Sequence, residues 1–275
     1  MLRMILAALA ALTATSALAD PLPLTIGEQH VVQAMDVERE INVVLPLSYG
    51  EDETRRYPVV YMLDGGVSQD LMMQVGVARW TQMWGRTEEF ILVGIETKDR
   101  QRELLPPTSD QEALDVWPTA GESALFRAFI KDKVLPKVAG AYRTDGRDFL
   151  VGESAAGHFV VETLLASPAL FDGYVAISPS LWWEEMLLAR KAEADGAGTP
   201  PLFISIENEG ETMDEGVRRV VAVREKAGAK TCFADRPDLT HGIAYHALLP
   251  GALQFLLPGP EPLPEEWGMV TGCAQ

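Results

Sequence analysis

One stretch of the chain, Phe149-Leu-Val-Gly-Glu-Ser-Ala-Ala-Gly-His158, decides the fold. The apolar run at residues 149–151 predicts a strand that ends at Gly152, and a helical pattern follows the turn. Ser154 therefore stands between a strand and a helix, which is the context in which a G-x-S-x-G motif presents a nucleophilic serine. The motif departs in one place, because Ala156 occupies the second glycine position.

The residue after the serine has its own predicted role. Ala155 would begin the helix, where backbone N–H groups lack intrahelical partners and favour negative charge. We therefore expect the N–H of Ala155 to be one donor of an oxyanion hole, a device that contributes about 3–4 kcal/mol per donor.

Other apolar runs indicate the fold class. Short apolar runs closed by turn residues are typical of buried parallel strands, and they recur at residues 58–63, 90–95, 174–177 and 202–206. Extended segments that also suit strands lie at residues 29–35, 38–45 and 229–234. Apolar residues at helical spacing occupy residues 122–135, 213–227 and 245–256. Strands that alternate with helices predict an α/β fold whose parallel sheet is covered on both faces.

A serine hydroxyl needs a base to take its proton, and the chain has four histidines. His241 is the predicted base, because it follows a strand-like segment in a loop at the carboxyl edge of the sheet and comes after the serine in the chain. His158 would lie one turn along the helix after the serine, as a packing residue. His30 comes too early in the chain, and His246 lies inside the helix at residues 245–256.

An acidic residue should orient the base. Its expected place is after the strand at residues 202–206, where carboxylates crowd together. We favour Glu209, with Glu207 next. Only the geometry of a triad can decide between them. Most acidic residues of this stretch must simply be solvated, and the candidates include Glu211, Asp214 and Glu215.

The first residues predict export. A basic start at Arg3, a short Leu- and Ala-rich run and an A-x-A site ending at Ala19 form a signal peptide over residues 1–19. The remaining residues 20–275 are expected to form a single α/β-hydrolase domain, periplasmic or secreted. The apolar run is too short for a transmembrane helix, which needs about 20 apolar residues.

Composition and charge exclude some partners. A formal charge of −17, with 47% hydrophobic residues, describes an acidic globular protein. Nucleic acids and anionic membranes attract basic surfaces, so neither is an expected partner. Two cysteines, Cys232 and Cys273, could form a disulfide in an oxidising compartment, while their 41-residue separation disfavours a zinc or redox motif.

Three further stretches resemble the putative esterase family of the α/β-hydrolase superfamily, which includes siderophore esterases and esterase D-like enzymes. Tyr57-Pro-Val-Val-Tyr-Met-Leu-Asp-Gly65 is similar to the family's strand and oxyanion turn. Asp99-Arg-Gln-Arg-Glu-Leu-Leu-Pro106 is similar to its R-D-L-T-P segment, with Glu103 in place of the aspartate. Phe171-Asp-Gly-Tyr-Val-Ala-Ile-Ser-Pro-Ser-Leu-Trp-Trp183 matches the segment after the elbow helix. The likeness covers residues 25–257.

The resemblance implies an eight-stranded, mostly parallel sheet without a large cap domain. It also implies that Gly65 or Gly66 supplies the second oxyanion donor, although both also suit a simple turn. Trp182 and Trp183 would lie near the mouth of the site, or pack in the core. Arg102 would face the cleft or anchor a loop through a carboxylate. Some siderophore esterases of this group resemble a Ser–His dyad, so a dyad stays open.

The sequence therefore favours hydrolysis of a carboxylic ester through an acyl-enzyme on Ser154, without a metal or organic cofactor. The substrate could be a siderophore ester, a short acyl ester or a lipid-like ester. The alternatives are acyl transfer on the same machinery and ligand binding without catalysis. Pocket shape would depend on two loops of unknown conformation, at residues 67–85 and 96–121, and the oligomeric state is undetermined.

Overall fold

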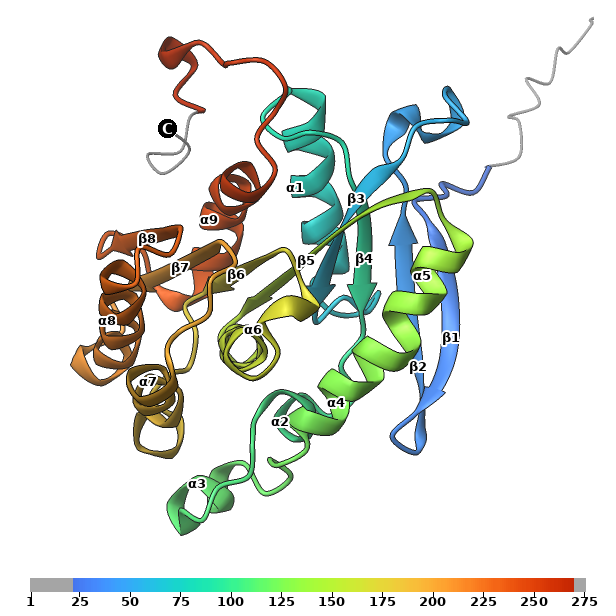
Figure 1. Ribbon diagram of the computed structural model, residues 1–275. Helices are drawn as coiled ribbons and strands as arrows, with labels where there is room; N and C mark the ends of the chain where they lie inside the picture. Colours follow the sequence, from blue (N-terminus) through green and yellow to red (C-terminus); the bar gives the residue numbers. More distant parts are fainter. Residues whose placement is uncertain (1–21, 270–275) are drawn as a thin grey trace, which may run out of the picture.

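The computed structural model describes residues 22–269, so the expected signal peptide lies outside the described residues. Eight strands form one sheet in the order β1-β2-β4-β3-β5-β6-β7-β8 (Figure 1). Strands β3 to β8 run parallel to one another, and the antiparallel strand pairs are β1 with β2 and β2 with β4. The predicted α/β fold with an eight-stranded, mostly parallel sheet is confirmed. The strands are β1 (Glu28–Ala34), β2 (Val37–Val44), β3 (Tyr57–Leu63), β4 (Ile91–Ile95), β5 (Thr144–Glu153), β6 (Gly173–Ile177), β7 (Leu202–Glu207) and β8 (Thr231–Arg236).

Helices cover both faces of the sheet, as expected (Figure 1). Helices α1 and α9 pack on one face, and α4 to α8 pack on the other. The central helix α6 is buried at every position from Ala156 to Leu164, which makes it the most enclosed helix next to the site. The α-helices are α1 (Leu71–Met83), α2 (Arg100–Leu104), α3 (Gln111–Val116), α4 (Ser123–Phe129), α5 (Leu135–Ala141), α6 (Ala155–Ala166), α7 (Trp183–Asp195), α8 (Glu211–Lys226) and α9 (His241–Leu256).

Both segments expected to be loops contain helices. Residues 67–85 include the whole of α1, and residues 96–121 include the short helices α2 and α3. Helix α1 was not apparent from the sequence because polar Gln74 and Thr81 lie on its buried face, while Met72 and Trp80 are exposed. An amphipathic stripe, the usual signal of a surface helix, is therefore missing.

Two other helix boundaries differ from expectation. The helix expected at residues 122–135 continues to Ala141 through a π-helical segment, Ile130–Val134. A proline inside an α-helix clashes with the carbonyl four residues earlier, and the wider π turn lets the chain pass Pro136. Helix α9 begins at His241 rather than at residue 245, so the predicted base is the first residue of a helix instead of a loop residue.

A buried ion pair anchors α2 to the sheet. Arg39 of β2 donates from Nη2 to Glu103 Oε1 over 2.7 Å, and both side chains are almost wholly buried. The second oxygen, Glu103 Oε2, accepts the Lys98 N–H at 3.0 Å. Losing one partner of a buried pair costs about 3–5 kcal/mol, so Glu103, in the place of the family's aspartate, fixes the loop that carries α2.

The expected disulfide falls partly outside the structure. Cys232 is buried in β8, and Cys273 lies beyond the described residues.

The turn between β5 and α6 depends on one missing methyl group. A Cβ at Gly152 would lie 2.5 Å from the Ala156 carbonyl oxygen, which belongs to the backbone and cannot rotate away. Gly157 is similarly close to β6, because a Cβ there would lie 3.0 Å from the Ile177 oxygen. These two glycines therefore let the strand and the helix cross closely. Ala156 is buried in the position where the motif usually has glycine.

Replacement of Gly152 by alanine should lower the free energy of unfolding by about 2–3 kcal/mol, the usual cost of overpacking a tight site. Gly76, on the exposed face of α1, provides the matched control, because a Cβ there meets nothing within 4 Å. Gly76→Ala should raise stability by up to about 1 kcal/mol through helix propensity. Urea unfolding of both variants measures the difference, and equal effects would contradict the close crossing.

Candidate active site

Ser154 occupies a strained turn that several backbone hydrogen bonds hold in place. Its φ of 59° and ψ of −119° are unfavourable for a residue with a Cβ. The Ser154 N–H donates to the Ile177 carbonyl at 3.0 Å, and its own carbonyl accepts from His158 and Ser180 at 2.9 and 3.1 Å. Such strain persists only when the surroundings over-determine it, and it is found mainly at functional sites.

His241 and Glu209 meet above the ends of neighbouring strands. A hydrogen bond joins His241 Nδ1 to Glu209 Oε1. A carboxylate can only accept, so Nδ1 carries the proton. The Ser178 hydroxyl donates to Glu209 Oε1 at 2.9 Å and lies 2.9 Å from His241 Nδ1, which restrains both groups.

The other acidic candidates lie elsewhere. Glu207 is buried and accepts from the Ser205 hydroxyl at 2.7 Å, and burial raises the pKa of its carboxyl group. Asp214 and Glu215 lie on α8, where each faces an arginine one turn along. The side chain of Glu211 lies outside what the structure describes. Of the candidates with described side chains, Glu209 is the one in contact with His241.

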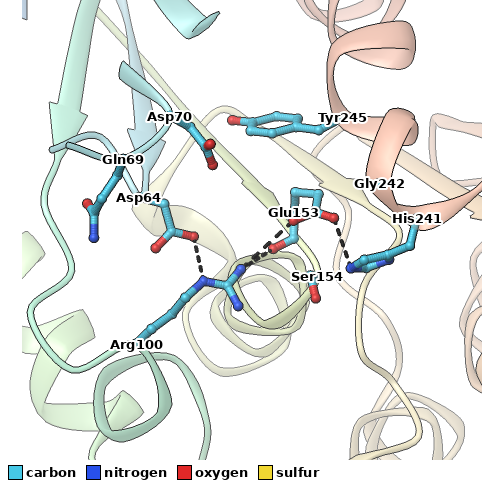
Figure 2. Close-up of a pocket in the computed structure, with 9 residues that line it drawn as sticks. All are labelled: Asp64, Gln69, Asp70, Arg100, Glu153, Ser154, His241, Gly242 and Tyr245. Carbon is cyan, nitrogen blue, oxygen red and sulfur yellow. Dashed lines mark hydrogen bonds and ion pairs between the residues drawn. The ribbon is translucent and has the colours of Figure 1, made fainter. Parts of the chain in front are cut away.

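The second nitrogen of His241 faces a carboxylate that the sequence analysis overlooked. His241 Nε2 lies 3.1 Å from Glu153 Oε1, an ion-pair distance (Figure 2). Across residues 22–269, the Ser154 hydroxyl makes no hydrogen bond, although Ser154 and His241 line the same cavities. Burial raises the pKa of Glu153 to about 7, and the nearby His241 and Arg100 oppose that rise. Glu153 is the variable residue of the G-x-S motif, so the motif gave no reason to single it out.

A polar cavity of about 460 Å³ opens on one side of Ser154 (Figure 2). Arg100 crosses it, donating from Nε to Asp64 Oδ2 at 2.9 Å and from Nη2 to the Glu153 carbonyl at 3.1 Å. Asp70 adds a third carboxylate, and its pKa is raised by burial and by Asp64. The lining residues are Asp64, Gln69, Asp70, Arg100, Glu153, Ser154, His241, Gly242 and Tyr245.

The arginine that faces the site is Arg100 rather than the predicted Arg102. Arg102 donates from Nε to Glu122 Oε2 at 2.6 Å and so anchors the loop after α3, which is the second of its two expected roles. Arg100, two residues earlier, lines the cavities on both sides of Ser154. The R-D-L-T-P likeness indicated the correct segment, but the orientation of α2 decides which arginine faces the site.

An aromatic cavity of about 380 Å³ lies on the other side of Ser154. Trp182 lines it beside Trp117, with ring centroids 5.1 Å apart. Trp183 does not reach this cavity, because it is fully buried and donates from Nε1 to the Pro106 carbonyl at 3.2 Å. The expectation that both tryptophans line the mouth is therefore wrong for Trp183, which packs in the core. Leu105 and Met213 complete the apolar wall.

The predicted oxyanion donors differ in availability. Ala155 is the first residue of α6, so its N–H has no intrahelical partner, and it lines the aromatic cavity. Gly65 is unsuitable, because its N–H donates to the Ile95 carbonyl at 2.9 Å. The Gly66 N–H donates to Gln69 Oε1 at 3.0 Å, so it could serve only if that side chain moves. The close approach of Gly65 to Gly94 instead gives Gly65 a packing role.

The remaining histidines lie apart from the site. His158 is buried on α6, where its Nδ1 lies 2.9 Å from the Ser180 carbonyl, in agreement with the predicted packing role. His30 contacts Tyr142 through Nε2 at 2.5 Å, and His246 is exposed on α9. Within residues 22–269, no group of three or more His, Cys, Asp or Glu side chains could hold a metal ion. Over the same residues, no helix is long and apolar enough to cross a membrane.

Comparison with known proteins gives one consistent relationship. The family described as "Putative esterase" matches residues 32–223. The ferri-bacillibactin esterase BesA of Bacillus subtilis is 28% identical over 233 residues, which cover 73% of this chain and 79% of that protein. The siderophore triacetylfusarinine C esterase of Aspergillus fumigatus is 28% identical over 192 residues, 63% of this chain and 62% of that protein. An IroE-like serine hydrolase from Shewanella oneidensis has a similar fold, with a TM-score of 0.73 at 22% identity, covering 84% of this chain and 80% of that one.

The two neighbouring tryptophans should respond differently to truncation. Trp183→Ala should lower the free energy of unfolding by about 3–5 kcal/mol, because it leaves a large buried cavity. Trp182→Ala should cost much less, since this side chain already borders an open cavity. Chemical denaturation of both variants checks the order, and a larger loss for Trp182 would contradict the assignment.

Proposed function

Because the chain belongs to the putative esterase family, it is a carboxylic ester hydrolase, and we propose that it acts through an acyl-enzyme on Ser154. The observation that carries this proposal is the strained placement of Ser154 at the start of α6, in the same cavities as a histidine that is bound to a carboxylate. A serine, a base and an orienting acid in this order along the chain are the parts that such chemistry needs.

In the proposed first step, His241 Nε2 takes the proton of the Ser154 hydroxyl as Oγ attacks the ester carbonyl carbon. Glu209 accepts the Nδ1–H hydrogen bond, so it fixes the tautomer that leaves the Nε2 lone pair free and stabilises the imidazolium that forms. The Ala155 N–H is directed to the oxyanion of the tetrahedral intermediate. His241 then returns its proton to the departing alcohol.

In the second step, a water molecule replaces the alcohol. His241 Nε2 takes a proton from this water, whose oxygen attacks the acyl carbonyl, and the bond to Ser154 Oγ breaks with return of the proton to Oγ. The serine is regenerated and a carboxylic acid is released. The Ser178 hydroxyl keeps Glu209 and His241 in register during both steps through its contacts with each.

For the substrate, we propose an ester of the siderophore type. The names of the relatives as siderophore esterases support this class. The aromatic cavity supports it as well, because Trp117 and Trp182 meet at 44° and offer ring faces on which an aromatic group can stack. Arg100 stands where the two cavities join, so its guanidinium could bind an anionic or carbonyl oxygen of the substrate.

A fluorophosphonate probe tests the nucleophile directly. The folded protein should react with the probe at Ser154, as mapped by peptide mass spectrometry, and Ser154→Ala should lose the label completely. His241→Ala should react far more slowly, because the hydroxyl has lost its base. Absence of label on folded wild-type protein would overturn the proposed mechanism.

The same assay separates Glu209 from Glu207. Glu209→Gln should slow labelling by roughly 10²- to 10⁴-fold, because an amide no longer holds the correct tautomer. Glu207→Gln is the matched control: it makes the same change two residues away, at a carboxylate that does not contact His241. Equal slowing in both variants would mean that Glu209 is not the orienting acid.

The substrate proposal predicts a selective effect of Trp182→Ala. Its kcat/KM should fall by up to about tenfold for iron-free enterobactin, an ester that carries aromatic rings, because one aromatic pairing contributes about 0.5–1.5 kcal/mol. Hydrolysis of ethyl acetate, which has no aromatic ring to stack on Trp182, should change little. Equal losses on both esters, or cleavage of the acetate alone by the wild type, would argue against the siderophore class.

A further inference from the structure

Glu153 occupies an unusual position for a carboxylate. It is the last residue of β5, directly before Ser154, and its side chain enters the polar cavity (Figure 2). There its Oε1 lies 3.1 Å from His241 Nε2. This is the nitrogen that must accept the Ser154 proton in the proposed mechanism. Glu153 and Ser154 are adjacent in the chain. Glu153 already contacts Nε2, and Ser154 must form a hydrogen bond to the same nitrogen in order to react.

We propose that Glu153 is a positioning residue that sets the pH range in which His241 can act as a base, by competing with Ser154 for Nε2. This inference rests on the proposed function, and it assigns a role to a residue outside the triad. In the resting arrangement, Nε2 faces Glu153. In the reactive arrangement, Nε2 faces the Ser154 hydroxyl.

The charges around the imidazole explain the competition. Glu209 faces Nδ1 and Glu153 faces Nε2, so the ring lies between two carboxylates. The 3.1 Å between Nε2 and Glu153 Oε1 is a hydrogen-bond distance, so one proton lies between the two atoms. While that proton is on Nε2, the imidazole cannot take the serine proton. If the proton instead resides on Glu153, its O–H donates to Nε2 and still blocks it. The proton shared by His241 and Glu153 must leave before Nε2 becomes free.

The surroundings of Glu153 keep this proton exchange near neutral pH. Arg100 of α2 approaches with Nη2 3.9 Å from Glu153 Oε2. Asp64 and Asp70 face Glu153 from the turn between β3 and α1, and both raise the pKa of its carboxyl group. From α9, Tyr245 lines the same cavity with its hydroxyl bound to Gln74. Burial outweighs the effect of the nearby cationic groups and brings the pKa of Glu153 to about 7. The carboxyl group therefore loses its proton as the pH rises through neutrality.

The test is the pH dependence of fluorophosphonate labelling at Ser154. In the wild type, the labelling rate should rise with pH through neutrality. Glu153→Leu removes the carboxylate and leaves no side-chain group that can donate to Nε2, so the midpoint of this rise should move down by about one pH unit. Well below the wild-type midpoint, the variant should then react about tenfold faster. Glu153→Asp, which retains a carboxylate, should restore most of the wild-type profile.

Asp70→Asn is the matched control, because it removes one negative charge from the same cavity without contact to His241. Its midpoint should move much less than that of Glu153→Leu. The pH dependence of kcat/KM for an ester substrate gives a second readout that does not depend on the probe, and its midpoint should move in the same direction.

The outcomes separate the two proposals. An unchanged midpoint in Glu153→Leu, or a shift equal to that of Asp70→Asn, would overturn the role of Glu153 while the serine mechanism stands. Loss of labelling at every pH in folded Glu153→Leu would also overturn it, since Glu153 would then assist His241 rather than compete for it. A wild-type protein that never labels at Ser154 would remove both proposals.

Discussion

The close crossing of β5 and α6 is the constraint on which the site depends. Only a hydrogen atom fits at Gly152, because the backbone of Ala156 passes directly over it. This approach forces the intervening Ser154 into a left-handed conformation, and the hydrogen bonds to Ile177, His158 and Ser180 keep it there. The same turn directs the side chain of Glu153 into the cavity beside the serine.

Neighbouring strands deliver the remaining groups to the same edge. Asp64 follows β3, Ser178 follows β6, Glu209 follows β7, and His241 begins α9 after β8. Because parallel strands end together, residues that are distant in sequence become neighbours without any long excursion of the chain. The buried pair of Arg39 and Glu103 extends this order to α2, which explains how Arg100 reaches the cavities from a short helix.

Local sequence patterns predicted the strands, the elbow and the order of its partners, because each depends on short apolar runs and turn residues. Glu209 could be favoured but not separated from Glu207, since both follow β7 and only their directions differ. Helix α1 escaped notice because its buried face carries Gln74, whose amide donates to the Leu63 carbonyl at 2.9 Å. The choice between Arg100 and Arg102, and the contact of Glu153 with His241, depend on side-chain directions that no local pattern encodes.

The two cavities on either side of Ser154 have an implication for the order of events. Both are bordered by Ser154, His241 and Arg100, but the first also holds three carboxylates, whereas the second is otherwise mainly apolar, with two tryptophans. On the proposed acyl-enzyme scheme, the two halves of the ester occupy different compartments, and the compartment vacated by the alcohol becomes the route by which water reaches the acyl carbon. Such an arrangement produces ping-pong kinetics, in which an alcohol that lingers in its compartment delays its own replacement by water and returns the acyl group to the starting ester.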